Sequence, residues 1–343
     1  RLTSLRVEPS QIAALVENKH AVQAPGGLVI ISAQSMDRLV GGVVKNSGAI
    51  EATGLQNNGG RILLSARTKV DNSGTLNASS ATGQGGSVSL QGEHIHLQGS
   101  SRIDASGATG GGTVLVGGNW QGSTDPLLQA TGQSTQAATT VAMDAGASID
   151  ASATVKGDGG KVVLWSDVQK PDGVTTAQGS VRAQGGSLGG NGGQVETSGQ
   201  SIDIDNFKVD TRAASPALGQ TGLWLIDPFN YTIGSTQASA ISSALGTSNV
   251  EVSTATSTTS FGLSGVSGIG DITVSSNINA LAAVGKLTLT ADSDIKLGAS
   301  ISAGGGIVLN AKGAIDTTAT TTSLTASFDP TKVNVGDTVT FSD

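Results

Sequence analysis

A glycine pair followed by alternating apolar residues recurs along the chain, and this repeat constrains the fold more than any other feature. The second glycine lies at positions 27, 60, 86, 112, 160 and 193, so the steps between successive copies are 33, 26, 26, 48 and 33. Short alternating segments bounded by Gly, Ser, Asn and Asp predict β-strands. Strands this short cannot bury an apolar face alone, so their regular return predicts a solenoid of parallel strands.

A second unit lies between the glycine pairs: a small residue, then Ile, Leu or Val, a polar residue and alanine. Its copies centre on Ile50, Leu76, Ile103, Ile149, Val181, Ile278 and Ile301. At about 26 residues per coil (one circuit of the solenoid), 343 residues give about 13 coils and a rod roughly 60 Å long. The step of 48 is interpreted as two coils, the hidden one at residues 147–151. The glycines are expected to supply positive φ at the corners.

Composition narrows the classes of protein. The 50 glycines come with only nine aromatic residues, so the core must consist of thin aliphatic layers. A disordered Gly/Ser tract would lack the regular apolar alternation, and hairpins of a β-sandwich array would not return the glycine pair so regularly. A net charge of −7 argues against a nucleic-acid partner. The chain has no cysteine for disulfides or thiolate metal sites, and no apolar run approaches the ~20 residues of a membrane span.

Four passages carry a resemblance to a known family. They are VKNSGAIEA (44–52) with GRILLSA (60–66), GTVLVGGNWQG (112–122), GDGGKVVLWSD (157–167) and GLWLIDPFNYTI (222–233). In this order they resemble the filamentous haemagglutinin family of large bacterial exoproteins exported by two-partner secretion. The resemblance covers about residues 40 to 315. It implies a right-handed parallel β-helix, a secreted or cell-surface location, a role in adhesion, and a dedicated outer-membrane transporter as partner.

The family comparison also suggests a division of the chain. The Asn-Pro-Asn motifs of the family's secretion domain do not occur, and residue 1 is Arg, so we expect an excerpt that begins late in that domain or after it. Residues 1–40 are then the end of a secretion-type region and residues 41–317 are β-helix repeats. In residues 318–343 glycine thins and alternation sharpens, which predicts a cap of the rod or the start of an immunoglobulin-like module.

Acidic residues on the outer face are the main candidate contacts. Asp203 and Asp205 alternate with isoleucines, so both carboxylates are expected to face outward. Asp104 and Asp150 occupy equivalent repeat positions and could belong to one ladder. Outward carboxylates on a β-helix can bind calcium or act on polysaccharide, and we predict carbohydrate or calcium contact at Asp203 and Asp205. The alternative is that these charges only keep the rod soluble and apart from its neighbours.

Other motifs give weaker signals. Asn77 and Asn230 begin Asn-x-Ser/Thr sequons, so both are candidate glycosylation sites. His94 and His96 share one face of a predicted strand, but a metal site would need a third ligand, and we expect two exposed strand residues. No metal or cofactor is predicted.

The Lys-Gly-Asp tripeptide and the three tryptophans each allow a structural and a functional interpretation. The tripeptide at residues 156–158, Lys-Gly-Asp, is of integrin-ligand type and lies on a predicted turn, where chance recurrence is the simpler account. Trp120, Trp165 and Trp224 end or follow apolar strands. Each could stack on a sugar, but we expect them to fill gaps beneath loops at the corners of the rod.

These observations favour a structural and binding segment of a secreted or surface-anchored bacterial adhesin, without enzymatic activity. Many weak outward contacts along a rod would sum to multivalent attachment to extracellular polysaccharide, cell-surface glycans or biofilm matrix. Self-association with neighbouring copies is a further partner prediction. Two alternatives stay open: a polysaccharide-degrading enzyme on the same scaffold, and a passive stalk that displays a distal toxin or effector domain.

Overall fold

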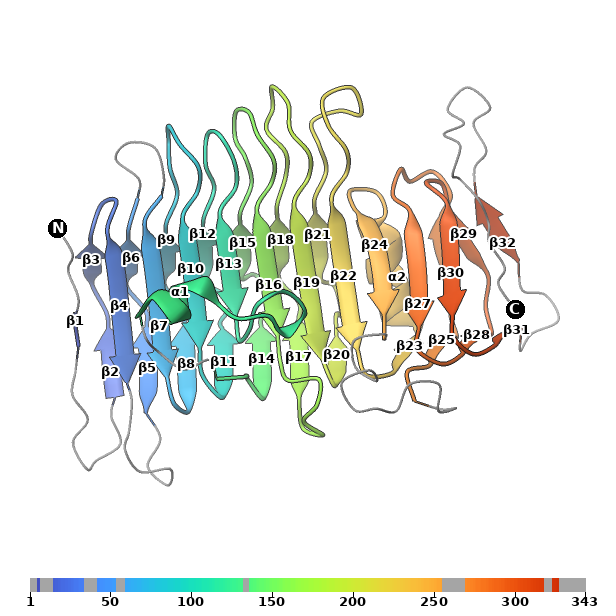
Figure 1. The fold of residues 1–343 in the computed structure, drawn as a ribbon, viewed down its shortest axis with the longest axis horizontal. Helices are drawn as coiled ribbons and strands as arrows, with labels where there is room; N and C mark the ends of the chain where they lie inside the picture. Colours follow the sequence, from blue (N-terminus) through green and yellow to red (C-terminus); the bar gives the residue numbers. More distant parts are fainter. Residues whose placement is uncertain are drawn as a thin grey trace.

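The chain folds into a parallel β-helix. The computed structural model describes residues 5–6, 15–33, 42–53, 59–131, 136–254, 269–317 and 323–326. Within these residues every paired strand runs parallel to its neighbour, and the coils stack along the long axis of the molecule (Figure 1). The predicted all-β solenoid is confirmed. No helix in the described part of the chain has the length and apolar character needed to cross a membrane.

One sheet extends through the whole described rod and contributes one strand to each coil. Its eleven strands are β1 (Leu5–Arg6), β4 (Leu28–Ala33), β7 (Arg61–Ala66), β10 (Ser87–Gln91), β13 (Thr113–Val116), β16 (Lys161–Trp165), β19 (Gln194–Gly199), β22 (Leu223–Pro228), β24 (Asn249–Ser253), β27 (Leu287–Ala291) and β30 (Ile307–Ala311). We call it the first sheet. The described residues form eleven coils, whose lengths differ from the 26 residues per coil assumed in the prediction of about 13 coils for all 343 residues. Leu287 pairs with Ile307 across the shortest coil, and Thr113 pairs with Lys161 across the longest.

The other two sides of the rod are formed by one pair of sheets toward the N-terminus and by a different pair toward the C-terminus. Toward the N-terminus the second sheet consists of β2 (Leu15–Asn18), β5 (Val43–Asn46), β8 (Lys69–Asn72), β11 (His94–Leu97), β14 (Thr140–Met143), β17 (Val174–Ala177) and β20 (Ser201–Asp203). The third consists of β3 (Ala21–Gln23), β6 (Ala49–Glu51), β9 (Thr75–Asn77), β12 (Arg102–Asp104), β15 (Ser148–Asp150), β18 (Ser180–Arg182) and β21 (Lys208–Asp210).

A helix marks the place where these two sheets end. Helix α2 (Ser235–Ala244) buries Ile241 and three alanines and contacts both β21 and β26, so it takes the place of one strand. Beyond it the sides are formed by a four-stranded sheet of β23 (Tyr231–Ile233), β25 (Ile272–Val274), β28 (Ile295–Leu297) and β31 (Ile315–Thr317), and a three-stranded sheet of β26 (Ile278–Ala280), β29 (Ile301–Ala303) and β32 (Leu324–Ala326).

The longest step of the glycine repeat is a single coil, so the hidden coil predicted at residues 147–151 was wrong. Strand β13 pairs directly with β16, with Val114 opposite Val162, and β15 belongs to the same coil as its third strand. The extra length is an insertion after β13 that holds a short 3-10 helix, η1 (Trp120–Gly122), and the helix α1 (Pro126–Thr131). Residues 117–131, which we call the cover, lie across the outer face of the first sheet (Figure 1).

The repeated glycine pairs are required by close packing between coils. The predicted positive φ is found at nine described glycines, but it is absent from five of the six pairs. Only Gly26 of the first pair has a positive φ, at 66°. A Cβ on Gly60 would lie 2.2 Å from the Ala52 carbonyl oxygen and 2.7 Å from that of Gly27. Side chains do not fit at such separations, so glycine lets the backbones of adjacent coils stack at the start of each first-sheet strand.

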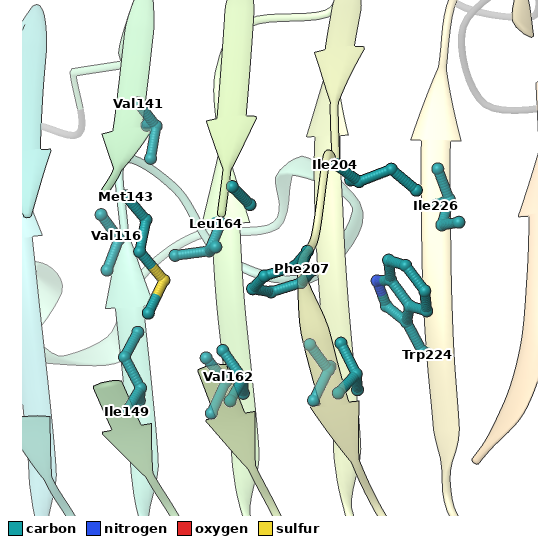
Figure 2. Close-up of a cluster of buried hydrophobic side chains, with 14 of the residues drawn as sticks. Val116, Val141, Met143, Ile149, Val162, Leu164, Ile204, Phe207, Trp224 and Ile226 are labelled. Atoms are coloured by element: carbon teal, nitrogen blue, oxygen red, sulfur yellow. The ribbon is translucent and has the colours of Figure 1, made fainter. Parts of the chain in front are cut away.

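Inward aliphatic side chains form the core, as the alternation predicts. Within the first sheet, Ile62, Val88 and Val114 lie in register and are at most 1% exposed. Trp224 differs from the prediction, because it lies inside the rod rather than beneath a corner loop. It is fully buried and meets the Phe207 ring edge-on, with centroids 5.6 Å apart (Figure 2).

A ladder of asparagines joins successive coils at one corner. The Asn18 amide nitrogen donates to Asn46 Oδ1 at 2.8 Å, that of Asn46 to Asn72 Oδ1 at 2.7 Å, and that of Asn72 to Ser101 Oγ at 2.6 Å. The amide nitrogen of Asn46 also donates to the Gly48 carbonyl oxygen. Asn46 and Asn72 are at most 2% exposed, so the ladder satisfies amide groups that would otherwise be buried without partners.

Replacing Asn46 with alanine is expected to lower the free energy of unfolding by about 1–3 kcal/mol, because Asn18 and Asn72 both lose a partner. Urea unfolding measures the loss. Asn279→Ala is the matched control, since that side chain is exposed on β26, and it should change stability by less than about 0.5 kcal/mol. Equal losses in both variants would refute a stabilising role for the ladder.

The predicted division of the chain is not tested, but the strand pairing crosses it. Strands β2, β3 and β4 precede residue 41 and pair with β5, β6 and β7 of the following coil. At the other end β32 pairs with β29, so the solenoid continues to residue 326. The alternating stretch at residues 329–341, on which the cap or immunoglobulin-like module was predicted, lies outside the described residues.

Candidate functional site

The two predicted contact carboxylates lie where the second sheet ends. Asp203 is the last residue of β20 and is exposed, whereas Asp205 is partly buried in the following corner. The Asp205 backbone N–H donates to Asp203 Oδ1 at 3.0 Å, and Asn206, with φ of 56°, donates its side-chain amide to Asp205 Oδ1 at 3.0 Å. The Asp203 carboxylate therefore stabilises its own corner, and its second oxygen is the group that a cation or sugar hydroxyl could reach. Ligand contact here stays a prediction.

The same corner arrangement recurs along the third sheet. Asp104 and Asp150 are in register, which confirms that they occupy equivalent positions. Each accepts the backbone N–H two residues later, at 2.8 and 2.9 Å. Asp210 does the same at 3.2 Å. Burial acts to raise the pKa of that carboxyl, but the hydrogen bonds and charge of Arg212 and the hydrogen bond from Gln184 together lower it. These aspartates form a structural column, because an Asx turn satisfies a backbone donor at each corner.

Both sequon asparagines also use their side-chain oxygens structurally. Asn77 accepts the Ser79 N–H at 3.0 Å. Asn230 is exposed and accepts the N–H of Gly270 at 2.5 Å and that of Asp271 at 3.1 Å. Glycosylation at either position stays a prediction.

The two histidines lie on the outer face of β11, as the alternation predicts, but are partly buried and hydrogen-bonded. His94 Nδ1 lies 2.9 Å from Thr140 Oγ1, and His96 Nε2 lies 2.8 Å from Asp144 Oδ1. His96 Nδ1 is 3.8 Å from Asp71 Oδ1. Among the described residues no group of three or more His, Cys, Asp or Glu side chains is arranged to hold a metal ion.

The remaining candidates from the sequence are the tripeptide at residues 156–158 and the tryptophans Trp165 and Trp120. At residues 156–158 the chain makes an exposed turn in which Asp158 accepts the Asn191 N–H at 2.7 Å, and receptor contact there is untested. The Trp165 ring packs so closely on Gly118 of the cover that a Cβ there would lie 2.6 Å from it, so this tryptophan does pack beneath a loop. Trp120 belongs to the cover itself, and its ring centroid is 5.8 Å from Lys161 Nζ.

A shallow groove of about 350 Å³ crosses the starts of β7, β10 and β13. Its floor is the glycine backbone described above, and its polar side chains are those of Arg61, Gln84, Ser87 and Thr113. Among the described residues of the lining, Arg61 alone is charged. Sequence reasoning missed this groove, although the register of Arg61, Ser87 and Thr113 follows from the spacing of the glycine pairs.

A buried carboxyl beneath the cover was also missed. Glu196 points outward from β19 yet is fully buried, and both of its oxygens accept the Gln121 N–H, at 2.9 and 3.0 Å. Ser198 Oγ donates to it at 2.6 Å. Burial raises the pKa of Glu196 from its ordinary 4.5 to about 7, against the opposing effects of Ser198, Gln121 and Lys161. An outward glutamate gives no sequence signal of burial, because the covering residue is 75 positions away.

Comparisons with known proteins find a likeness among solved structures. No protein-family model and no curated protein matches the chain. Among solved structures it is similar to the HMW1 secretion domain from Haemophilus influenzae, with 25% sequence identity and a TM-score of 0.48. The similarity covers 62% of this chain and 49% of that one, so it spans about half of the matched structure. At this TM-score the likeness adds nothing to the fold assignment, which rests on the strand pairing.

Proposed function

We propose that this protein is a rigid, rod-shaped segment of a secreted bacterial adhesin exported by two-partner secretion. The observation that supports the proposal is the uninterrupted first sheet, to which each of the family-like passages contributes a strand, in chain order. The apolar cores of the four family-like passages are β7, β13, β16 and β22, all in this sheet. An outer-membrane transporter is the partner that the resemblance implies, and the bacterial surface or medium is the proposed location.

The rod would act by multivalent contact. Outward positions repeat once per coil at about 4.8 Å, so any weak contact with a repeating ligand can recur along the axis. The groove at Arg61 and the corner at Asp203 both present polar groups suited to sugar hydroxyls. We propose extracellular polysaccharide or cell-surface glycans as the ligand, self-association as a secondary contact, and no enzymatic step.

Co-sedimentation of the protein with polysaccharide from the producing strain tests this function. The assay is run with and without calcium, and the size distribution of the polysaccharide is measured afterwards. Binding with unchanged chain length is the expected result. Shortened chains would overturn the adhesin in favour of a depolymerase, and absence of both binding and cleavage would favour a passive stalk.

Charge removal at the Asp203 corner tests the predicted calcium or carbohydrate contact. Asp203→Asn with Asp205→Asn keeps an acceptor oxygen for the Asp205 N–H, so the corner should fold unchanged. We expect any calcium-dependent part of polysaccharide binding to fall at least tenfold. Asp104→Asn is the matched control, because it alters an equivalent corner in the third sheet and should bind like the wild type. Calcium dependence that survives the double substitution would place the contact elsewhere.

A further inference from the structure

The two ends of the cover contact the rod through different chemistry. At one end Leu127 and Leu128 of α1 pack on Leu28 and Leu63 in a small apolar cluster outside the main core. At the other end Gln121, held at a positive φ of 49°, points its N–H at the Glu196 carboxyl. Strand β13 pairs with β16 without help from the cover, so residues 118–124 can detach while the sheet stays intact.

Few charges in the described part of the chain face the Glu196 carboxyl. Lys161 of β16 is the cation whose charge acts on it, and the Lys161 ammonium also lies near the Trp120 ring of the cover. On the other neighbouring strand, β22, Leu225 is in register with Glu196 and Asp227 with Ser198. The acid of the cover, Asp125, is directed to Ser89 and to its own helix. Among these described neighbours an ionised Glu196 is therefore buried with Lys161 as its nearby cation, between the apolar Val163 of β16 and Leu225 of β22.

We propose that residues 118–124 form a pH-sensitive latch, which stays closed over the first sheet while the Glu196 carboxyl is protonated and opens when that carboxyl ionises. The latch goes beyond the proposed function and does not depend on it. It would control access to the outer face of β16 and β19.

The direction of the response follows from linkage. Burial raises the pKa of Glu196 to about 7 in the closed form, whereas release into water returns it toward 4.5. Closure is thus favoured most at acidic pH, and this advantage is lost as the pH rises through about 7. For these two values the opening equilibrium constant increases about 25-fold between pH 5.5 and pH 8.0.

Hydrogen exchange of the Gln121 backbone amide tests the latch, since its hydrogen bond to Glu196 joins the latch to the sheet, whereas those of Trp120, Gly122 and Ser123 are made within the latch. Exchange of the full chain is followed by mass spectrometry from pH 5.5 to 8.0 and corrected for the intrinsic pH dependence of amide exchange. We expect about 25-fold loss of protection in the Gln121 amide. The amides of β13 and β16 should keep their protection, which separates latch opening from unfolding.

Two variants complete the test. Glu196→Gln stays neutral, so its latch should be at least as protected at pH 8.0 as the wild type is at pH 5.5. Glu251→Gln is the matched control: it lies in the same outward column, two strands away on β24, and should keep the wild-type response. Protection that is independent of pH in the wild type, or an unchanged response in Glu196→Gln, would overturn the proposal.

Discussion

Replacing Gly111 with alanine is expected to lower the free energy of unfolding by about 3 kcal/mol or more. The added Cβ would lie 1.8 Å from the Ala151 carbonyl oxygen and 2.3 Å from the Gly160 nitrogen. Both are backbone atoms of the next coil, so no side chain can rotate away, and the coils must separate locally. Urea unfolding followed by circular dichroism measures the loss.

The adjacent glycine provides the control. A Cβ on Gly110 would meet nothing closer than 3.5 Å, and the residue has no positive φ. Gly110→Ala should be neutral or stabilise by up to about 1 kcal/mol, because alanine restricts the unfolded chain. If Gly111→Ala and Gly110→Ala had equal effects, the glycine repeat would reflect flexibility or composition rather than contact between coils.

Periodic features of the structure could be predicted because each depends on local spacing. The regular steps between glycine pairs place Ile62, Val88 and Val114 in one column, and the second repeated unit places Asp104 beside Asp150. In a solenoid, a constant step in sequence becomes a constant position in space. The same reasoning gave the wrong physical cause for the glycine pairs, because sequence alone cannot distinguish a requirement for positive φ from a requirement for close approach.

Interruptions of the period could not be predicted. The cover lengthens the coil from β13 to β16 to nearly twice the length of the two coils before it, which invited the interpretation of a hidden coil. Helix α2 takes the place of a strand without changing the repeat in the first sheet. Burial of Glu196 depends on Gln121, and burial of Trp224 depends on which side of β22 faces inward. Such facts depend on long-range contacts that a repeat pattern does not encode.

Replacing Trp224 with alanine is expected to cost about 3–5 kcal/mol of unfolding free energy. The side chain is fully buried, contacts Phe207 edge-on at an interplanar angle of 66°, and donates its Nε1–H to Thr197 Oγ1 at 3.2 Å. It lies close to the place where α2 replaces a strand, and Tyr231 of the same coil is also buried. Alanine would leave a cavity that the stacked sheets cannot close.

The position of Trp224 in the solenoid predicts where the damage appears. Because each coil contacts mainly its neighbours, unfolding should become easier around β19, β22 and β24 first, while β7 and β10 keep their protection. Hydrogen exchange resolved by peptide measures this gradient. Trp224→Phe keeps an aromatic ring and should lose less than half as much stability, whereas Trp165→Ala, at a partly buried outward position, should leave the core strands unchanged. A uniform loss of protection along the rod would instead mean that the coils unfold as one cooperative unit.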